Sequence, residues 1–234
     1  MIRSNVMSED EAKKRAARAA LELLPESGVI GLGTGSTTRF FIEAVGELVR
    51  AGRRLCGVPT SQQSRTLASQ CGIPLLDDTG PWSIDLCVDG ADEVSDALDL
   101  IKGGGAAHTR EKIVNYAAKA NVIIVDDSKL SKKLGEKRAV PVEVLVFAHL
   151  TTRAALVHFG APDLRLRDGA PVITDSGNYI YDLGVPPIDD PRSLDSELRR
   201  VPGVVETGLF CARADWVIVA EAQGIRKLSR SSGG

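Results

Sequence analysis

The N-terminal part of this chain alternates short apolar runs with longer segments that place apolar residues at helical spacing. The short runs are continuous, which is typical of strands buried on both faces of a parallel sheet. Strands are predicted at "GVIGLG", "RLCGVP", "SIDLCVDG" and "NVIIVDD", and helices at 8–23 (capped by Ser8), 36–52, 61–70 and 109–120. This alternation predicts a doubly wound α/β domain.

Beyond about residue 137 the pattern changes to short strands that follow one another through glycine or aspartate turns. Strands are predicted at 139–147, 164–168, 171–175, 178–182 and 204–210, with helices at 148–160 and 193–203. Such a succession is typical of an antiparallel α+β unit. The apolar run at 215–222 is expected to rejoin the first sheet. We therefore predict a first domain of residues 1–137 with 212–234 and a smaller α+β domain of residues 138–211.

The composition excludes several classes of function. The chain has 234 residues, a formal net charge of −2 and 4% aromatic residues, so neither nucleic acid nor a membrane is an expected partner. No apolar run approaches the roughly 20 residues that span a bilayer. The four cysteines form no C-x-x-C pair, which favours buried thiols in a reducing compartment, and we expect a cytoplasmic protein.

The segment "GLGTGSTT" lies where a predicted strand leads into a helix, a natural place for an anion. It matches neither dinucleotide nor P-loop motifs, because Ser36 replaces the third glycine and no lysine follows. Its N–H groups and hydroxyls suit a phosphate monoester or sugar hydroxyls, and a plain tight turn with Ser36 as the helix N-cap is the alternative. The hydroxyls are those of Thr34, Ser36, Thr37 and Thr38.

Charged residues follow two further apolar segments. Asp89 and Asp92 end a predicted strand, where ligands bind in open α/β sheets, although a solvated turn is equally compatible. These acids lack partner histidines and the spacing of a calcium loop, so no metal site is predicted. Lys102 directly precedes three glycines, which let a backbone approach a ligand closely.

The helix after the glycines is expected to start at Thr109 as its N-cap, which places Glu111 in the first turn. Lys129 follows the next strand, either in the site or as an exposed turn residue. His108 is expected to be a satisfied or exposed histidine, because no partner residues can be read from the sequence. Together these groups suit proton transfer on a phosphorylated sugar, with a carboxylate as base and a lysine stabilising charge on oxygen.

In this order and spacing, "GLGTGSTT", "VDGADEV", "IKGGGAAHTREKIV" and "VDDSK" resemble the ribose-5-phosphate isomerase A family. "AVPVEVLV", "VITDSGN" and "VPGVVETGLF" extend the resemblance from about Glu11 to Trp216. The resemblance implies a Rossmann-like domain with a ferredoxin-like α+β domain. It also implies interconversion of ribose 5-phosphate and ribulose 5-phosphate in the non-oxidative pentose phosphate pathway, without metal or cofactor, by a homodimer or a tetramer.

The family's functional residues carry over onto matching positions of this chain. Glu111 matches the proton acceptor, Asp89 and Lys102 are the further catalytic candidates, and Lys13 resembles a residue near the phosphate. His108 departs from a position that is commonly apolar in the family. The substrate-binding residues implied are Thr34, Gly35, Ser36, Thr37, Asp89, Gly90, Ala91, Asp92, Lys102, Gly103, Gly104, Gly105 and Lys129.

Two other functions compete with the isomerase. A non-enzymatic sugar-phosphate sensor on the same fold would want an added DNA-binding segment, which this chain lacks. An acyl-CoA transferase of related fold would use a glutamate as nucleophile, and the lysine–triple-glycine turn and the small size count against it. An assay of ribose 5-phosphate conversion in the presence of a chelator would separate the three.

Overall fold

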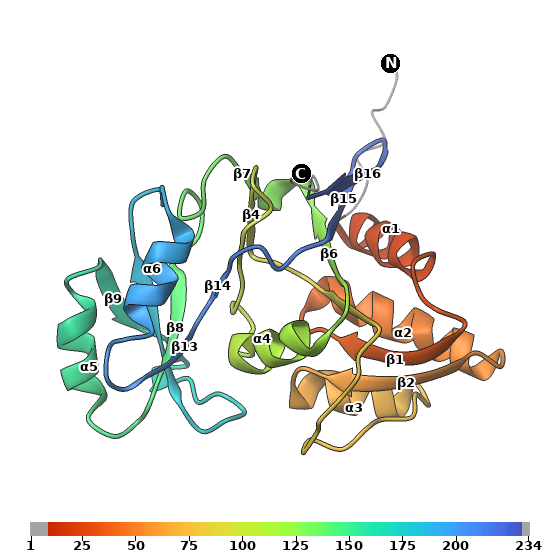
Figure 1. Ribbon diagram of the computed structural model, residues 1–234, viewed down its shortest axis with the longest axis horizontal. Coiled ribbons are helices and arrows are strands. Elements are labelled where there is room, and N and C mark those ends of the chain that lie inside the picture. Colours follow the sequence, from red (N-terminus) through yellow and green to blue (C-terminus); the bar gives the residue numbers. More distant parts are fainter. Residues whose placement is uncertain (1–8, 231–234) are drawn as a thin grey trace. The chain divides into compact units, whose positions relative to one another are not determined.

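Six strands of the computed structural model form one sheet in the order β16-β15-β6-β3-β1-β2 (Figure 1). Every neighbouring pair is parallel except the β15–β16 hairpin. The predicted parallel α/β sheet is therefore confirmed, including the return of the segment after residue 215. The strands are β1 (Ser27–Leu32), β2 (Arg54–Pro59), β3 (Leu86–Asp89), β6 (Asn121–Asp126), β15 (Trp216–Glu221) and β16 (Gly224–Ser229).

Three helices bury their apolar sides against this sheet and against one another. They are α1 (Glu9–Leu21), α2 (Ser36–Arg50) and α3 (Gln62–Gln70). Ile30, Leu32 and Phe41 are fully buried members of the resulting core. The structure describes residues 9–230, so the predicted cap Ser8 lies outside the described residues.

The strand order places a topological switch point between β1 and β3. The chain moves from β1 outward to β2, then returns to β3 on the other side of β1. The loops at the carboxyl ends of the two strands are joined there, since the Gly33 amide donates to the Val88 carbonyl at 3.0 Å. Ligands in open α/β sheets bind at such a point, so the fold positions the first candidate cluster.

Contacts divide the chain into two compact units. The first is Met1–Gly90 with Ala117–Ser128 and Ala214–Gly234, and the second is Ala91–Tyr116 with Lys129–Arg213. This division differs from the predicted boundaries after residues 137 and 211. Residues 91–116 belong to the second unit because β4 (Glu93–Ser95) and β5 (Leu100–Ile101) pair with strands of that unit.

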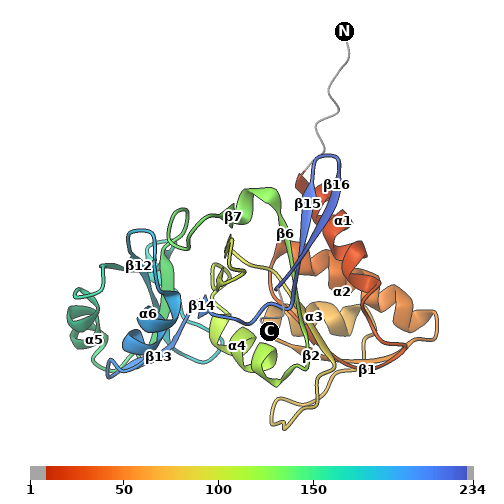
Figure 2. The ribbon, with the colours of Figure 1, turned by 45° about the horizontal axis from the view of Figure 1, so that its top comes forward.

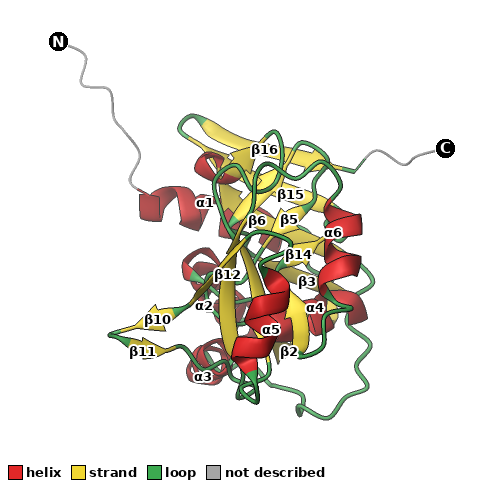
Figure 3. Ribbon diagram, turned by 90° about the vertical axis from the view of Figure 1, so that its left-hand side faces the viewer, coloured by secondary structure: helices red, strands yellow, loops and turns green. Residues whose placement is uncertain are grey.

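The second unit contains two small four-stranded sheets and a hairpin (Figure 3). The antiparallel sheet β13-β8-β12-β9 packs with helices α5 (His149–Leu156) and α6 (Pro191–Leu198) around a core that includes Tyr181. The remaining strands are β7 (Leu130–Ser131), β8 (Val140–Val144), β9 (Ala161–Leu164), β10 (Leu166–Arg167), β11 (Ala170–Pro171), β12 (Tyr179–Gly184), β13 (Val204–Thr207) and β14 (Leu209–Phe210).

The predicted strand at 204–210 is wrong as a single element. It is split into β13 and β14, which belong to different sheets. Gly208 lies at the break, and a Cβ there would be 2.2 Å from the Lys102 carbonyl oxygen. The chain can therefore change sheets here only because a glycine lets two backbones come this close.

Other strand predictions need correction as well. The strand predicted at 164–168 is divided between the last residue of β9 and the short β10, which belong to different sheets. The strand predicted at 171–175 ends at Pro171, because the side chains of Thr174 and Asn178 both donate to Glu143 Oε1 at 2.8 Å and fix a turn. Strand β16 was not predicted; it carries charged residues along the sheet edge and forms the hairpin visible beside β15 (Figure 2).

Candidate active site

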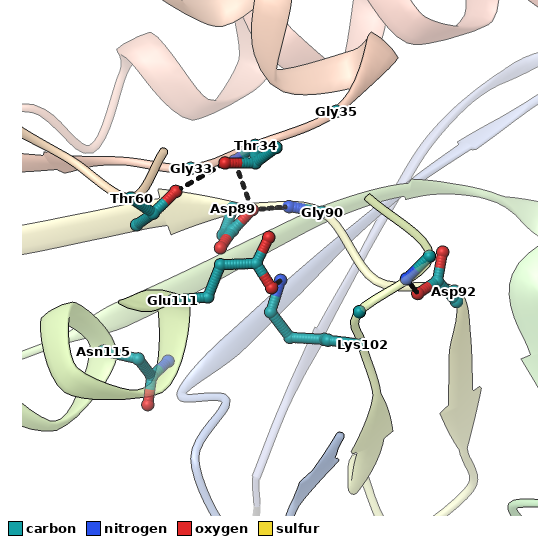
Figure 4. Close-up of polar contacts among 12 residues, drawn as sticks. Gly33, Thr34, Gly35, Thr60, Asp89, Gly90, Asp92, Lys102, Glu111 and Asn115 are labelled. Atoms are coloured by element: carbon teal, nitrogen blue, oxygen red, sulfur yellow. Dashed lines mark hydrogen bonds and ion pairs between the residues drawn. The ribbon is translucent and has the colours of Figure 1, made fainter. Parts of the chain in front are cut away.

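In the first unit, Asp89 is held at the carboxyl end of β3 by the backbone around it (Figure 4). The carboxylate is 1% exposed, and its Oδ1 accepts the Thr34 amide at 3.0 Å and the Gly90 amide at 2.7 Å. A Cβ on Gly33 would lie 2.2 Å from Asp89 Oδ1 and 2.6 Å from its Cα. Gly33 is thus required so that the turn after β1 can contact this aspartate.

The hydroxyls of the "GLGTGSTT" turn divide into two groups. Thr34 Oγ1 lies 2.7 Å from Thr60 Oγ1 and 2.8 Å from Ser61 Oγ, and Thr38 Oγ1 donates to the Gly35 carbonyl at 2.9 Å. The Thr34 and Thr38 hydroxyls were expected to face a ligand, but they form hydrogen bonds with other residues of the first unit instead.

The accessible part of the turn is Gly35 to Thr37. Gly35 and Ser36 are exposed and Thr37 is half-buried. The N-cap of α2 is Gly35, at φ +123° and without a side-chain cap, so the alternative with Ser36 as N-cap is wrong. The first turn of α2 also contains no acid. Uncapped N–H groups in a helical turn that contains no acid suit an anion.

In the second unit, Lys102 and Glu111 form a buried ion pair. Lys102 Nζ lies 3.1 Å from Glu111 Oε2, and the two residues are only 2% and 3% exposed. Their side chains point toward each other in Figure 4. Glu111 is in the first turn of α4 (His108–Ala117), as predicted, although the helix begins one residue before the expected cap Thr109. The Phe210 ring centroid lies 5.4 Å from the Lys102 ammonium.

The glycine loop that carries Lys102 is anchored through its backbone. The Lys102 amide donates to the Gly208 carbonyl at 2.9 Å, and the Gly104 amide donates to Asp92 Oδ2 at 2.7 Å. A Cβ on Gly104 would lie 2.6 Å from Asp92 Oδ1. Asp92 therefore supports the loop, and Gly104 must be a glycine for that contact.

His108 is fully buried rather than exposed. Its Nε2 lies 3.4 Å from the Glu206 carbonyl oxygen, and no hydrogen bond to Nδ1 is made by the described residues. The ring lies against Gly103 (φ +115°), where a Cβ would be 2.7 Å from Nδ1. Burial first, and then the neighbouring Lys112, lower the pKa of His108 to about 3. The imidazole is therefore neutral at pH 7.

The depressed pKa of His108 predicts a pH-dependent stability. Between pH 6.5 and about 3 the unfolded chain binds a proton at His108 that the folded chain does not. The free energy of unfolding therefore decreases as the pH falls through that window. We expect His108→Leu to remove this loss, which amounts to about 1.4 kcal/mol per pH unit. Thermal unfolding of both proteins from pH 7 to 4 measures it. The exposed His158→Gln is the control, and equal pH slopes for wild type and His108→Leu would contradict the assignment.

The remaining predicted residues lie as follows. Lys129 is half-buried at the end of a 3₁₀ turn, Asp127–Lys129, and Lys13 pairs with Glu9 at 2.5 Å. Gly90 and Ala91 directly follow Asp89, and Gly105 ends the glycine loop. The described residues contain no group of three His, Cys, Asp or Glu side chains arranged to hold a metal ion. Within that same part of the chain, no helix has the length and apolar character needed to cross a membrane.

Three residues that support the Thr34 turn lie outside the sequence motifs. Thr60, Ser61 and Ser64 surround the Thr34 hydroxyl, and Ser64 Oγ also donates to the Gly33 carbonyl at 2.6 Å. The only sequence signal was Ser61 at the start of the predicted helix, where it caps α3 through the Ser64 amide at 3.1 Å.

Comparison with known proteins identifies close relatives. The family model described as ribose 5-phosphate isomerase A (phosphoriboisomerase A) matches residues 56–224. Ribose-5-phosphate isomerase A of Thermococcus kodakarensis is 44% identical over 230 residues, covering 96% of this chain and 100% of the relative. That of Thermosynechococcus vestitus is 47% identical over 224 residues, covering 92% and 94%. A solved structure of D-ribose-5-phosphate isomerase in complex with phospho-erythronic acid superimposes with a TM-score of 0.92 at 44% identity, covering 96% of this chain and 100% of the other.

Proposed function

The chain belongs to the ribose 5-phosphate isomerase A family and interconverts ribose 5-phosphate and ribulose 5-phosphate, and from that premise we propose which of its residues carry out the reaction. The activity expected from the sequence is confirmed, and the sensor and acyl-CoA transferase alternatives fall away. The reaction moves a proton between C2 and C1 of the open-chain sugar, so it needs a base, a group that stabilises the enediolate, and a site for the phosphate.

Glu111 is the base in this proposal. It takes the proton from C2 of the aldose, the electron pair moves toward the C1 carbonyl, and an enediolate forms. The same carboxyl group returns the proton to C1 as the C2 carbonyl of the ketose forms, while the proton of the C2 hydroxyl passes to the C1 oxygen. The observation that carries this role is the buried ion pair with Lys102 at 3.1 Å, which holds the carboxylate in a defined place. The variant that tests it is Glu111→Gln, which keeps the side-chain shape and removes the basicity.

Lys102 stabilises the oxygen that becomes negative in the enediolate. An ammonium group 2% exposed acts where water screens little, so it favours the transition state more than it would at the surface. The backbone bonds of the glycine loop fix its position before the substrate arrives. No step of this scheme requires a metal ion or a cofactor.

Asp89 handles hydroxyl protons while the sugar ring opens. Ring opening removes the proton of the C1 hydroxyl and protonates the ring oxygen, and a single carboxylate can serve both transfers in sequence. The amides of Thr34 and Gly90 keep Asp89 Oδ1 in place.

The uncapped N–H groups of Gly35 to Thr37 bind the substrate phosphate and Lys129 adds positive charge, while Thr34, whose amide and hydroxyl already form hydrogen bonds, shapes the turn. A phosphorylated ligand is consistent with the relative solved with phospho-erythronic acid, which carries a phosphate and a carboxylate on one carbon chain. The further substrate contacts in the proposal are Gly90, Ala91, Asp92 and Gly103 to Gly105.

Removal of the Lys129 charge tests the phosphate site. We expect Lys129→Ala to raise KM for ribose 5-phosphate by roughly 10-fold with little change in kcat, because the phosphate interaction is the same in the bound substrate and the transition state. Steady-state kinetics measure both constants. Lys132→Ala, which removes an exposed lysine three residues away, is the control. An unchanged KM in Lys129→Ala would rule out this contact.

We also propose that the enzyme is a homodimer, with a tetramer as the alternative assembly, and that it works in the cytoplasm. Several large apolar side chains of the second unit are exposed in the single chain, among them Phe147 at 88% and Leu150 at 67%. Four free cysteines suit a reducing compartment. Light scattering gives the mass in solution, and a monomer would contradict the first statement; cell fractionation tests the second.

A further inference from the structure

Arg165, which lies outside every motif of the sequence discussed above, contacts the glycine loop from within the second unit. Its Nη1 donates to the Gly103 carbonyl at 2.6 Å. That carbonyl is one peptide after Lys102, and it also accepts the Ala106 amide at 3.0 Å. Arg165 thus bonds directly to the segment that carries the catalytic lysine.

The rest of the Arg165 guanidinium is held by Asp182 of β12. Arg165 Nε donates to Asp182 Oδ2 at 2.8 Å, and Nη2 donates to Asp182 Oδ1. The Arg165 side chain is 15% exposed and that of Asp182 32%. A planar guanidinium can form this two-pronged contact and still present a third N–H to the carbonyl, whereas a lysine ammonium is a single point of charge.

The backbone of Arg165 is fixed as well. Its amide donates to the Ile180 carbonyl at 2.9 Å, and its carbonyl accepts the Val172 amide at 2.9 Å. The guanidinium therefore extends from a rigid base, and Asp182 lies in register with Asp163 of the adjacent strand β9. This arrangement connects the antiparallel sheet of the second unit to the loop.

Three peptide groups around Lys102 are then restrained from different directions. The Lys102 amide is bonded to Gly208, the Gly103 carbonyl to Arg165, and the Gly104 amide to Asp92. Gly103 itself has φ +115°, and because glycine has no side chain, no packing of its own side chain holds this conformation. Of the three partners, Arg165 supplies a charged donor to the carbonyl that immediately follows the lysine.

We propose that Arg165, oriented by Asp182, is a positioning residue that fixes the Gly103 carbonyl and thereby holds the Lys102 ammonium where the enediolate oxygen develops. The inference rests on the proposed role of Lys102 in the isomerisation. Arg165 itself does not need to contact the substrate. Its removal leaves a lysine that is still present but less accurately placed, and a displacement of about 1 Å is enough to cost roughly 100-fold in rate.

The first test is a pair of variants with a matched control. Arg165→Met is expected to lower kcat by roughly 10- to 100-fold with KM changed less than about 3-fold, because the loss falls on transition-state stabilisation. Arg165→Lys keeps the charge but not the three-way contact, so about a 10-fold loss is expected. The control is Arg153→Met, which removes another arginine of this unit that donates to a backbone carbonyl, that of Pro162 at 3.3 Å. It should keep wild-type kinetics.

The second test separates positioning from a general loss of structure. In a Lys102→Met background, Arg165→Met should lower kcat by less than about 3-fold, because residues that act as one unit are not additive. An equal loss in both backgrounds, or wild-type kcat in Arg165→Met, would overturn the proposal. If Arg165→Met does not fold, as judged by its thermal transition, the same cycle with Arg165→Lys decides. Wild-type turnover in Lys102→Met alone would instead refute the role of Lys102.

Discussion

Glu111→Gln is expected to lower kcat by roughly 10²–10⁴-fold while ribose 5-phosphate still binds. Glutamine has almost the same shape as glutamate but cannot accept a proton from carbon. The buried position of Glu111, 3% exposed beside Lys102, leaves little room for water to replace the carboxylate as base. We therefore expect the loss to fall on kcat, with a much smaller change in KM.

Solvent deuterium provides the specific readout for this prediction. In deuterated water the wild type should place deuterium at C1 of ribulose 5-phosphate or C2 of ribose 5-phosphate, and the variant should do so hardly at all. Glu143→Gln is the control, because Glu143 is another buried carboxylate of the same unit, 1% exposed, whose partners include Thr109 and Thr174. It should lower the melting temperature and leave the isotope exchange intact. Near wild-type turnover in Glu111→Gln would assign the base to another residue.

Lys102→Met should lower kcat by roughly 10²–10³-fold, equivalent to about 3–4 kcal/mol of transition-state stabilisation. Methionine retains much of the apolar stem beside Phe210 but removes the charge that we propose stabilises the enediolate oxygen. The variant also leaves the buried Glu111 carboxylate without its 3.1 Å partner, so reduced stability is expected as well.

The measurement compares kcat per folded molecule, with folding monitored by thermal denaturation. Lys112→Met is the matched control, since Lys112 Nζ lies 4.9 Å from the centre of the same Phe210 ring but bonds to Glu206 at 2.9 Å. This control should reduce stability and keep kcat within about 3-fold of wild type, since it removes a partly exposed ion pair. Similar losses of turnover in the two lysine variants would show that a cation beside Phe210, and not Lys102 in particular, is what the reaction needs.

Much of the first unit followed from local patterns. Continuous apolar runs located β1, β2, β3 and β6, because strands buried on both faces leave no polar positions along their length. The first-turn position of Glu111 followed from Thr109 as the expected helix cap, although the helix begins one residue earlier. Strand β16 was not predicted from the sequence, because its charged, exposed residues resemble a surface loop until the pairing with β15 is known.

By itself, the sequence determined the strands and helices of the parallel sheet apart from β16, and the family resemblance that the relatives confirm; it also predicted which segments carry the chemistry. All of these depend on residues close together in the chain, where periodicity and spacing are visible. Only the tertiary structure shows that the Thr34 hydroxyl bonds to Thr60 and that Arg165 donates to the Gly103 carbonyl. It alone shows that position 33 must be a glycine because Asp89 packs against it. These contacts join residues 26 to 62 positions apart. Only packing brings such groups together, because hydrogen bonds and close backbone approaches depend on distance in space and leave no periodic trace along the chain.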